Sequence, residues 1–467
     1  MAIKIALPKG RLLRRTAARL QKAEWGLDEY HSRIGFYRPK SEKFPELLIR
    51  VFHEKDIPIQ IAMGNYDLGI CGSDWIEELM VKYPSSDLVR VRDLGYGEGT
   101  LFMASAAVPG GQRNGGLVRI ASEYPNLAES FALKQRLSRF SVFPVWGAAE
   151  AYPPENADMV LLPARTGAEL SDYGMTAVSR VLDFSAFFVA NRSSWESKDL
   201  DKIVTSICDT LPEVEKKPDS GEAVEPIAVK KSYTRIKITD GTVRLALPDG
   251  HQQLPTVNIL NRAGIEIEDY PSETGNRRPR IKLDGVAVKV IRPQDMPLQV
   301  ANGNFDLAVT GRDWLTEHLY QFPSSPVREL LDLEFSRVRV VAVVHRDLAV
   351  EDASGLREYI AARQEPFRVA SEYVNIADKY ARDNHLGHYR VIPTWGATEA
   401  FLPEDADLLI ENTETGRTIA RHNLKIIDML FISTACLIGN AGAIADPAKG
   451  KRIAEIVSKF RAGVGVA

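Results

Sequence analysis

Lys9, Gly10 and Arg11 are the first residues in the chain whose types suggest chemistry. They lie where an apolar run over 3–7 gives way to a helical pattern starting near residue 12, so they would form a strand-to-helix turn. Free N–H groups at a helix N-terminus attract anions, glycine lets the backbone come close, and the two basic side chains add positive charge. The turn therefore predicts a phosphate site, although a solvated helix cap would need the same residues.

A second candidate site follows a buried strand late in the chain, in the stretch ADLLIENTETGRTIA. The strand ends in Glu411 and is followed by Thr415, Gly416, Arg417 and Thr418. Hydroxyls and successive backbone N–H groups around a glycine form an anion-binding nest, and a carboxylate at the strand end can accept hydrogen bonds from ribose hydroxyls. This order is typical of a phosphoribosyl pocket, and a polar turn that caps a helix is the alternative.

A third set consists of Asp-Ile/Met-Pro, Gly-Asn-Tyr/Phe-Asp-Leu and Gly-x-Asp-Trp motifs, which occur twice. Their glycines and aspartates mark sharp turns at strand ends, where ligands bind in open α/β sheets. Structural turns alone explain most of the series. Arg292 and Asp295, in the second occurrence, are the candidates for substrate contact, whereas Trp146 and Trp395 in the WGA turns are expected in the core.

These motifs belong to an internal repeat that covers most of the chain. Val51–Trp75 aligned with Val290–Trp314 gives identity at twelve of twenty-five positions without a gap. The match continues in the same order through ALPKG with ALPDG, ASEYPN with ASEYVN, and VWGAAEAYPPENAD with TWGATEAFLPEDAD. Because the matches are collinear, the chain is read as a tandem duplication.

The repeat defines the expected domains. The first copy spans residues 1–211, the second spans 235–467, and the Pro-, Glu-, Lys- and Gly-rich stretch at 212–234 reads as an exposed linker. Inside each copy, short β-branched runs alternate with helical stretches, as in IKIAL, RLLRRTAARLQKAEW, LLIRVF and YDLGIC. This alternation predicts an α/β fold with largely parallel sheets and helices on both faces.

Composition excludes several other classes of protein. Hydrophobic residues make up 45% of the 467 residues and charged residues 26%, which is typical of a globular protein. A formal net charge of -3 without a basic stripe argues against nucleic-acid partners. The three cysteines lack metal-site spacing, and the N-terminal apolar run is too short for a signal peptide or a membrane span, so a cytoplasmic protein is expected.

Taken together, the motifs resemble the ATP phosphoribosyltransferase family, whose pattern runs ALPKGRL, RPxDIP, GxxDLGITGxD, a YPN segment and a TG-R-T-L loop. The resemblance covers nearly the whole chain, twice. It implies a bilobal fold like that of type II periplasmic-binding proteins, with two lobes per copy joined by two crossings. The implied reaction joins ATP to phosphoribosyl pyrophosphate with Mg²⁺, giving N1-phosphoribosyl-ATP and pyrophosphate in the first step of histidine biosynthesis.

Each copy departs from the family pattern where the other keeps it. The first copy retains Lys9 and Arg11, where the second has Asp249 and His251; the second retains Arg292, where the first has His53. In the phosphate loop, Glu411, Arg417 and Thr418 correspond to Leu162, Ala168 and Glu169. Since a carboxylate at 169 would repel phosphate, phosphoribosyl binding is assigned to the second copy.

The resulting hypothesis is that one chain acts as a pseudo-dimer, with further homo-oligomers of the chain as an additional possibility. Arg292, Lys9 and Arg11 would stabilise the departing pyrophosphate; Gly10, Asp295, Glu411 and the loop from Thr415 to Thr418 would bind substrate. Magnesium would be held by substrate oxygens and water, so no metal ligand is named. The resemblance also implies a separate regulatory subunit similar to histidyl-tRNA synthetase. The alternative is a catalytically inactive, cytoplasmic ligand-binding module of the same fold.

Overall fold

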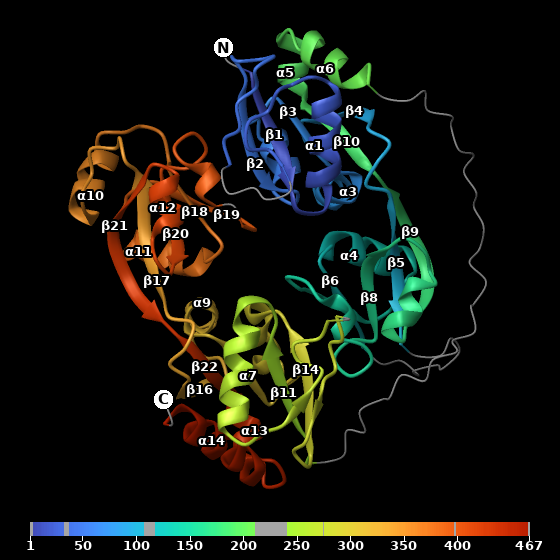
Figure 1. Ribbon diagram of the computed structural model, residues 1–467, viewed down its shortest axis with the longest axis vertical. Helices are drawn as coiled ribbons and strands as arrows, with labels where there is room; N and C mark the ends of the chain where they lie inside the picture. Colours follow the sequence, from blue (N-terminus) through green and yellow to red (C-terminus); the bar gives the residue numbers. More distant parts are fainter. Residues whose placement is uncertain are drawn as a thin grey trace. The chain divides into compact units, whose positions relative to one another are not determined.

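The computed structural model describes residues 3–31, 37–106, 117–210, 241–273, 275–396 and 398–465, which form two compact units (Figure 1). Unit 1 comprises Met1–Pro144, Ala157–Ser232 and Thr394–Asp405, and unit 2 comprises Val145–Asn156, Tyr233–Pro393 and Ala406–Ala467. Each unit contains two lobes, and each lobe is built on a five-stranded sheet. The linker expected over 212–234 lies outside the described residues.

The first lobe of unit 1 has the strand order β2-β1-β3-β10-β4. Its strands are β1 (Lys4–Lys9), β2 (Leu48–His53), β3 (Leu68–Gly72), β4 (Leu88–Asp93) and β10 (Ala186–Asn191). Its helices are α1 (Leu13–Lys22), α2 (Ile57–Ala62), α3 (Ser73–Lys82), α5 (Arg192–Ser197) and α6 (Asp201–Cys208). The apolar faces of α1 and α6 bury Leu20 and Ile203 against the sheet residues Ile5 and Ile70.

The second lobe of unit 1 repeats this order as β7-β6-β8-β5-β9. Its elements are β5 (Gly99–Ser105), β6 (Val118–Ser122), α4 (Pro125–Lys134), β7 (Phe140–Pro144), β8 (Met159–Ala164) and β9 (Thr176–Phe184). Trp75 from α3 stacks on Tyr124, with ring centroids 4.2 Å apart, and belongs to the core of this lobe. The two lobes therefore share a packed contact at α3.

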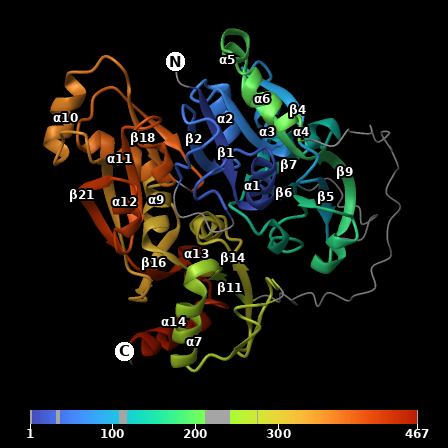
Figure 2. The ribbon, with the colours of Figure 1, turned by 45° about the horizontal axis from the view of Figure 1, so that its top comes forward.

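Unit 2 has the same architecture. Its first lobe contains β11 (Val243–Pro248), α7 (Gln253–Arg262), β14 (Val286–Ile291), α8 (Met296–Ala301), β15 (Leu307–Gly311), α9 (Arg312–Gln321), β16 (Val327–Asp332), β22 (Ala435–Asn440), α13 (Ala441–Ala445) and α14 (Gly450–Val464), with a small ribbon of β12 (Ile267–Glu268) and β13 (Arg280–Ile281). Helix α14 runs beside α7 (Figures 1 and 2), where Phe460 and Ile259 share one core.

The second lobe of unit 2 is ordered β19-β18-β20-β17-β21. It contains β17 (Val338–His345), α10 (Ala353–Ala361), β18 (Phe367–Ser371), α11 (Val374–Asp383), β19 (Tyr389–Pro393), β20 (Leu408–Thr413), α12 (Arg417–Arg421) and β21 (Leu424–Ser433). Helix α10 lies at the outer edge of this lobe in both views (Figures 1 and 2). Asp352 caps its first turn by accepting a hydrogen bond from the Gly355 N–H, at 2.8 Å.

The sheets are mixed rather than uniformly parallel. In each lobe three strands are parallel, and the two strands that connect the lobes pair antiparallel with them or with each other. The connections are short: β4 leads directly into β5, and β9 into β10, so the chain crosses between the lobes twice. These crossings confirm the bilobal fold expected above, and they explain the antiparallel strands, because a returning strand must enter the sheet from its opposite end.

The compact units differ from the two sequence copies by two twelve-residue segments. The first exchanged segment, Val145–Asn156, belongs to the first copy in sequence but packs in unit 2; the second, Thr394–Asp405, belongs to the second copy but packs in unit 1. The contacts are equivalent in the two units. Lys289 Nζ lies 2.6 Å from the Glu155 carboxylate in unit 2, and Arg50 pairs with the corresponding Glu404 in unit 1. The exchange is thus reciprocal.

Within the described residues, every helix falls short of the length and apolar character needed to cross a membrane.

Candidate active site

The parallel pairing of β11 with β14 brings two candidate turns of unit 2 together. Pro248 is in register with Ile291, so the turns that follow the two strands, at Asp249 and at Arg292, lie side by side at the same edge of the sheet. Gly250 takes a φ of +73° as the backbone turns into the helix, a conformation that glycine adopts readily. Arg292 begins the next short helix at Pro293–Asp295.

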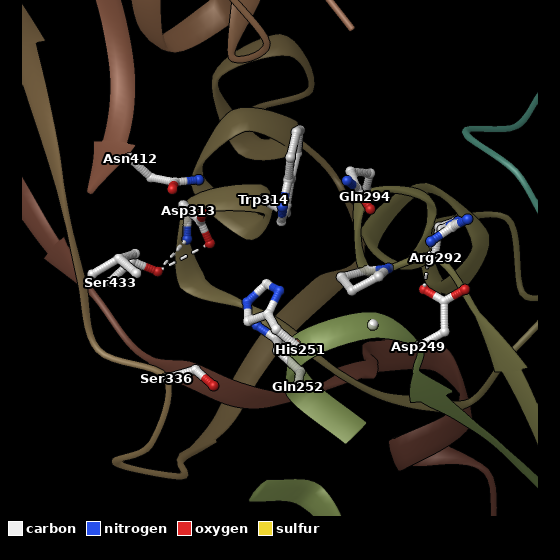
Figure 3. A pocket seen from close by; sticks show the side chains of 13 residues that line it. Asp249, His251, Gln252, Arg292, Gln294, Asp313, Trp314, Ser336, Asn412 and Ser433 are labelled. Carbon is white, nitrogen blue, oxygen red and sulfur yellow. Dashed lines mark hydrogen bonds and ion pairs between the residues drawn. The ribbon is translucent and has the colours of Figure 1, made fainter. Parts of the chain in front are cut away.

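Beside these turns lies a cavity of about 130 Å³, bounded by both lobes of unit 2 (Figure 3). Its walls are Asp249, Gly250, His251, Gln252, Arg292, Pro293, Gln294, Asp313, Trp314, Ser336, Val338, Asn412 and Ser433. Figure 3 shows Trp314 and His251 in the middle of the group, with Arg292 and Asp249 on one side and Asn412 and Ser433 on the other. Most of the lining residues are therefore polar.

Several polar atoms at this cavity have no hydrogen-bond partner in the described part of the chain. They are Arg292 Nε and the side-chain oxygens of Gln252 and Gln294. Gln252 is only 6% exposed, so its amide oxygen lies away from bulk water. Because an unsatisfied buried polar group costs about 1–3 kcal/mol, such a cluster is typical of a surface that a polar ligand or water completes.

The charges at the cavity form a continuous chain. Arg292 Nη1 lies 3.2 Å from one oxygen of Asp249, and Arg277 Nη1 lies 2.9 Å from the other. Arg277 Nε also contacts the carboxylate of Glu150 at 3.0 Å. Asp249, which stands where the first copy has Lys9, is thus held between two guanidinium groups. Arg277 was not singled out by the sequence, because it lies outside the repeated motifs.

The phosphate loop of the second copy joins β20 to α12. Gly416 has a φ of +76°, and the Gly416 N–H donates to the Thr413 hydroxyl at 2.9 Å. The side chains of Thr415, Arg417 and Thr418 are exposed. The loop therefore presents its hydroxyls and its guanidinium to solvent, in the arrangement expected of an anion site.

The structure also brings Arg339 beside this loop, a residue that the sequence analysis did not identify. It lies on β17, in register with Thr413, and a Cβ built on Gly416 would lie 3.8 Å from its Nη2 atom. The corresponding residue of the first copy is Thr100, which pairs with Ala164 in the same way. The difference between Thr100 in the first copy and Arg339 in the second was the sequence signal that could have identified Arg339.

Glu411 lies on β20 next to the cavity residue Asn412 and is half-buried. The Asn412 side-chain amide donates to the Tyr373 hydroxyl at 2.6 Å. Burial, with Asp313 and Glu411 nearby, raises the pKa of Tyr373 well above its ordinary value, so the phenol stays protonated. Glu411 is therefore close to the cavity wall, where a sugar hydroxyl would need an acceptor.

The phosphate loop of the first copy is closed by its own carboxylate. Glu169, the counterpart of Thr418, accepts a hydrogen bond from the backbone N–H of Arg165 at 2.8 Å. An N–H group at the start of this loop is thereby occupied by an anionic side chain. That N–H is not available to an external anion while this contact is present.

His53 replaces Arg292 in the first copy and supplies no positive charge at neutral pH. Burial, together with the nearby cations Lys55 and Lys9, lowers the pKa of His53 to about 3. The imidazole is therefore neutral where the second copy carries a guanidinium.

Arg11 is engaged inside unit 1. Its Nη2 atom lies 3.0 Å from Glu54 and 3.0 Å from Asp74, and its guanidinium stacks over the Phe184 ring at 4.7 Å. In the second copy the counterparts of Arg11 and Glu54 are His251 and Pro293, so the pair is lost together. The neighbouring Lys9 lies over the Tyr37 ring at 5.4 Å, and Gly10 takes a φ of +83°.

Asp295 lies behind the cavity rather than on its wall. Its carboxylate accepts hydrogen bonds from the Trp146 N–H, at 3.1 Å to each oxygen, and from the Tyr152 hydroxyl at 3.3 Å. Asp295 is 4% exposed. The structure therefore gives this residue protein partners from the first exchanged segment, where the sequence suggested a substrate contact.

The carboxylates at the cavity are already engaged by protein donors. Asp249 is bound by two arginines, and Asp313 accepts from the Ser433 hydroxyl at 3.0 Å and from the Tyr373 hydroxyl at 2.5 Å. Across the described ranges no group of three or more His, Cys, Asp or Glu side chains is placed to hold a metal ion.

Comparison with known proteins matches both copies to one family. The family model described as ATP phosphoribosyltransferase matches residues 53–211 and 292–462, which together exceed half of the chain. The matched ranges include Arg292, Glu411 and the loop from Thr415 to Thr418, and they begin after Lys9 and Arg11.

Individual relatives agree. An ATP phosphoribosyltransferase from Prosthecochloris aestuarii is 33% identical over 211 residues, covering 45% of this chain and 68% of the relative. One from Nitratidesulfovibrio vulgaris is 32% identical over 223 residues, covering 46% and 69%. A solved ATP phosphoribosyl transferase (HisG:HisZ) complex from Thermotoga maritima aligns with 48% of this chain and all of that chain, at 20% identity and a TM-score of 0.40. The chain therefore belongs to the ATP phosphoribosyltransferase family, carries the family's core twice, and is a pentosyltransferase of histidine biosynthesis.

Proposed function

We propose that the second copy binds phosphoribosyl pyrophosphate and that its site is the one where the family's reaction takes place. The observation that carries this assignment is the contrast between the two phosphate loops. Glu169 occupies the loop of the first copy, whereas Thr418 leaves the corresponding loop of the second copy open to an anion. Arg339 adds a cation beside the open loop only.

In this proposal the sugar substrate extends from the loop towards the cavity. The 5′-phosphate binds the hydroxyls of Thr415 and Thr418 with Arg417 and Arg339, and Glu411 accepts hydrogen bonds from the ribose. The diphosphate on C1′ faces Arg292, whose side chain is 42% exposed. The aromatic side chains of Trp314 and His251, which line the cavity, suit the adenine of ATP.

The chemistry requires little covalent participation by the protein. The neutral N1 of adenine forms a bond to C1′ as the bond from C1′ to the diphosphate oxygen breaks, and pyrophosphate leaves with its electron pair. The protein aligns the two substrates and stabilises the negative charge that accumulates on the leaving group. In this proposal Arg292 performs that task. Arg277, already shared by Asp249 and Glu150, sets the local charge balance.

Magnesium enters this scheme with the substrate. Diphosphate oxygens are strong ligands for Mg²⁺, which usually keeps several waters and few protein ligands in such sites. Asp249 and Asp313 already accept hydrogen bonds from protein donors, which supports a Mg²⁺ ion held mainly by the substrate and water. The contribution of Lys9, Gly10 and Arg11 to phosphate binding stays a prediction, as does a histidyl-tRNA-synthetase-like regulatory subunit.

The test is release of pyrophosphate by the purified chain with ATP, phosphoribosyl pyrophosphate and Mg²⁺, run with each substrate omitted in turn. We expect release only when both substrates are present, and the same assay with an added histidyl-tRNA-synthetase-like subunit reports any dependence on a partner. Ligand binding without pyrophosphate release under all of these conditions would support the inactive binding module instead.

A further inference from the structure

The first exchanged segment places residues of the first copy directly behind the proposed site of the second. Trp146 donates its backbone N–H to Asp295, and its ring lies 5.6 Å from the ring of Trp314, which lines the cavity. Asp295 closes the short helix that begins after Arg292. The segment therefore holds the Asp295 end of the turn that begins at Arg292.

Gly147 makes the closest approach to Arg292. A Cβ built on Gly147 would lie 2.9 Å from Arg292 Nε and 3.4 Å from Nη2, and Gly147 has a φ of +156°. A contact under 3.0 Å requires one group to shift, so the guanidinium occupies space that exists because residue 147 has no side chain. Arg292 Nε is buried at this contact without a hydrogen-bond partner in the described residues.

Glu150 is connected to the guanidinium of Arg292 by a series of ion pairs. It contacts Arg277 at 3.0 Å, Arg277 contacts Asp249 at 2.9 Å, and Asp249 contacts Arg292 at 3.2 Å. Arg277 and Asp249 are 20% and 7% exposed, so the middle of this chain of ion pairs is largely shielded from solvent. A shielded network of this kind responds as a unit when one member changes.

We propose that Gly147 and Glu150 of the first copy are positioning residues for Arg292, so that the first copy sets the affinity of the second copy's site for the diphosphate of its sugar substrate. This inference rests on the proposed function. It gives the diverged first copy a role at the reacting centre that is independent of its own closed phosphate loop. The proposed role belongs to the first exchanged segment, and not to the turn that contains Lys9 and Arg11.

The second exchanged segment provides a matched control. Gly396 corresponds to Gly147 and also has a positive φ, of +96°, so alanine at either position introduces backbone strain. The residue of unit 1 that corresponds to Arg292 is the neutral His53. A general effect of strain in an exchanged segment would therefore appear in both variants, and a specific effect on Arg292 in only one.

The experiment compares Gly147→Ala with Gly396→Ala in the full chain, measuring kcat and the KM for each substrate. We expect Gly147→Ala to raise the KM for phosphoribosyl pyrophosphate about 10-fold or more while the KM for ATP stays within about 2-fold. Gly396→Ala should leave both constants within about 2-fold. Equal changes in the two variants, or a Gly147→Ala variant with wild-type constants, overturn the inference.

A second variant decides the question if Gly147→Ala does not fold. Glu150→Gln keeps an oxygen acceptor for Arg277 but removes the charge, so Arg277 should pair more fully with Asp249, and Asp249 should hold Arg292 less firmly. We expect about a 3-fold fall in the KM for phosphoribosyl pyrophosphate, with an unchanged melting temperature. An unchanged or higher KM contradicts the positioning role.

Failure of the proposed function is distinguishable from failure of this inference. If the wild-type chain releases no pyrophosphate, the proposed function fails, and calorimetric titration with inorganic pyrophosphate then tests the positioning role alone. Under the inference, Gly147→Ala binds pyrophosphate at least about 10-fold more weakly than wild type or Gly396→Ala. Equal affinities of the three proteins refute it.

Discussion

The carboxylate of Glu169 accepts a hydrogen bond from the backbone N–H of Arg165 at 2.8 Å. This single contact gives the first copy's loop an internal anion at the place where the second copy has the neutral, exposed Thr418. A loop that already binds a carboxylate cannot offer the same N–H to a phosphate. The duplication has therefore produced one loop that is closed by its own sequence and one that is open.

The first prediction transfers this closure to the second copy. Thr418→Glu should reduce the affinity for phosphoribosyl pyrophosphate roughly 100-fold, because the new carboxylate repels phosphate and competes for the N–H of Glu414, the counterpart of Arg165. Isothermal titration of the full chain measures the change. Thr166→Ala, an alteration in the first copy's loop, should change the affinity less than about 2-fold. Comparable losses of affinity in the two variants would mean that binding has been assigned to the wrong copy.

The second prediction concerns Arg339. Arg339→Gln should raise the KM for phosphoribosyl pyrophosphate by roughly 10- to 100-fold, because the guanidinium beside Gly416 would otherwise form a charge-assisted contact with phosphate. The KM for ATP should stay within about 2-fold of wild type in steady-state assays. Thr100→Gln, at the corresponding position of the first copy, serves as the control. A uniform loss for both substrates would indicate that Arg339 supports the sheet instead.

The third prediction separates stability from catalysis at Arg11. Arg11→Ala leaves Glu54 and Asp74 buried without their guanidinium partner and should lower the free energy of unfolding by about 2 kcal/mol. The value is smaller than for a fully buried pair because the Arg11 side chain is 35% exposed. Urea denaturation measures it. Lys9→Ala removes a positive charge but leaves the ion pairs of Arg11 with Glu54 and Asp74 intact. An effect of this variant on the catalytic rate would therefore not be confused with a loss of stability. Wild-type stability for Arg11→Ala would contradict the structural reading.

The fourth prediction follows from the buried imidazole of His53. Its folded-state pKa of about 3 lies below the ordinary value of 6.5, so the unfolded chain binds more protons at any pH between these values. Folding stability from this group is complete above pH 6.5 and is lost as the pH falls towards 3. Between pH 6.5 and pH 5 the loss amounts to about 2 kcal/mol. His53→Gln should remove it, which thermal melting of both proteins across that range will show; a pH-independent difference between them would refute it.

Much of the fold could be predicted because its signals are local. The run Ile3–Leu7 and the helical pattern after it became β1 and α1, and the strands expected at LLIRVF and YDLGIC are β2 and β3. The antiparallel strands were not predicted, because an apolar run has the same pattern whichever direction its partner runs. The choice is made by the crossings between lobes, which a single sequence does not reveal.

The candidate site was predicted less completely, for a related reason. The motif with Arg292 was identified from its repeat, but the partners of Asp295 come from residues 146 and 152, which are far away in sequence. Arg277 and Arg339 were missed because each is a single arginine outside a motif. Only the pairing of β17 with β20, and the packing of the first exchanged segment, bring them to the loop and the cavity.

The exchanged segments also bear on how such a gene can change. A recombination between the two repeats would delete one copy and leave a single hybrid with one twelve-residue segment and one surface shaped to receive such a segment from elsewhere. That product could complete itself only by meeting a second molecule, so its assembly would weaken on dilution, whereas the fused chain carries both segments at fixed stoichiometry. Selection would therefore act against loss of either repeat, even though only one retains an open phosphate loop.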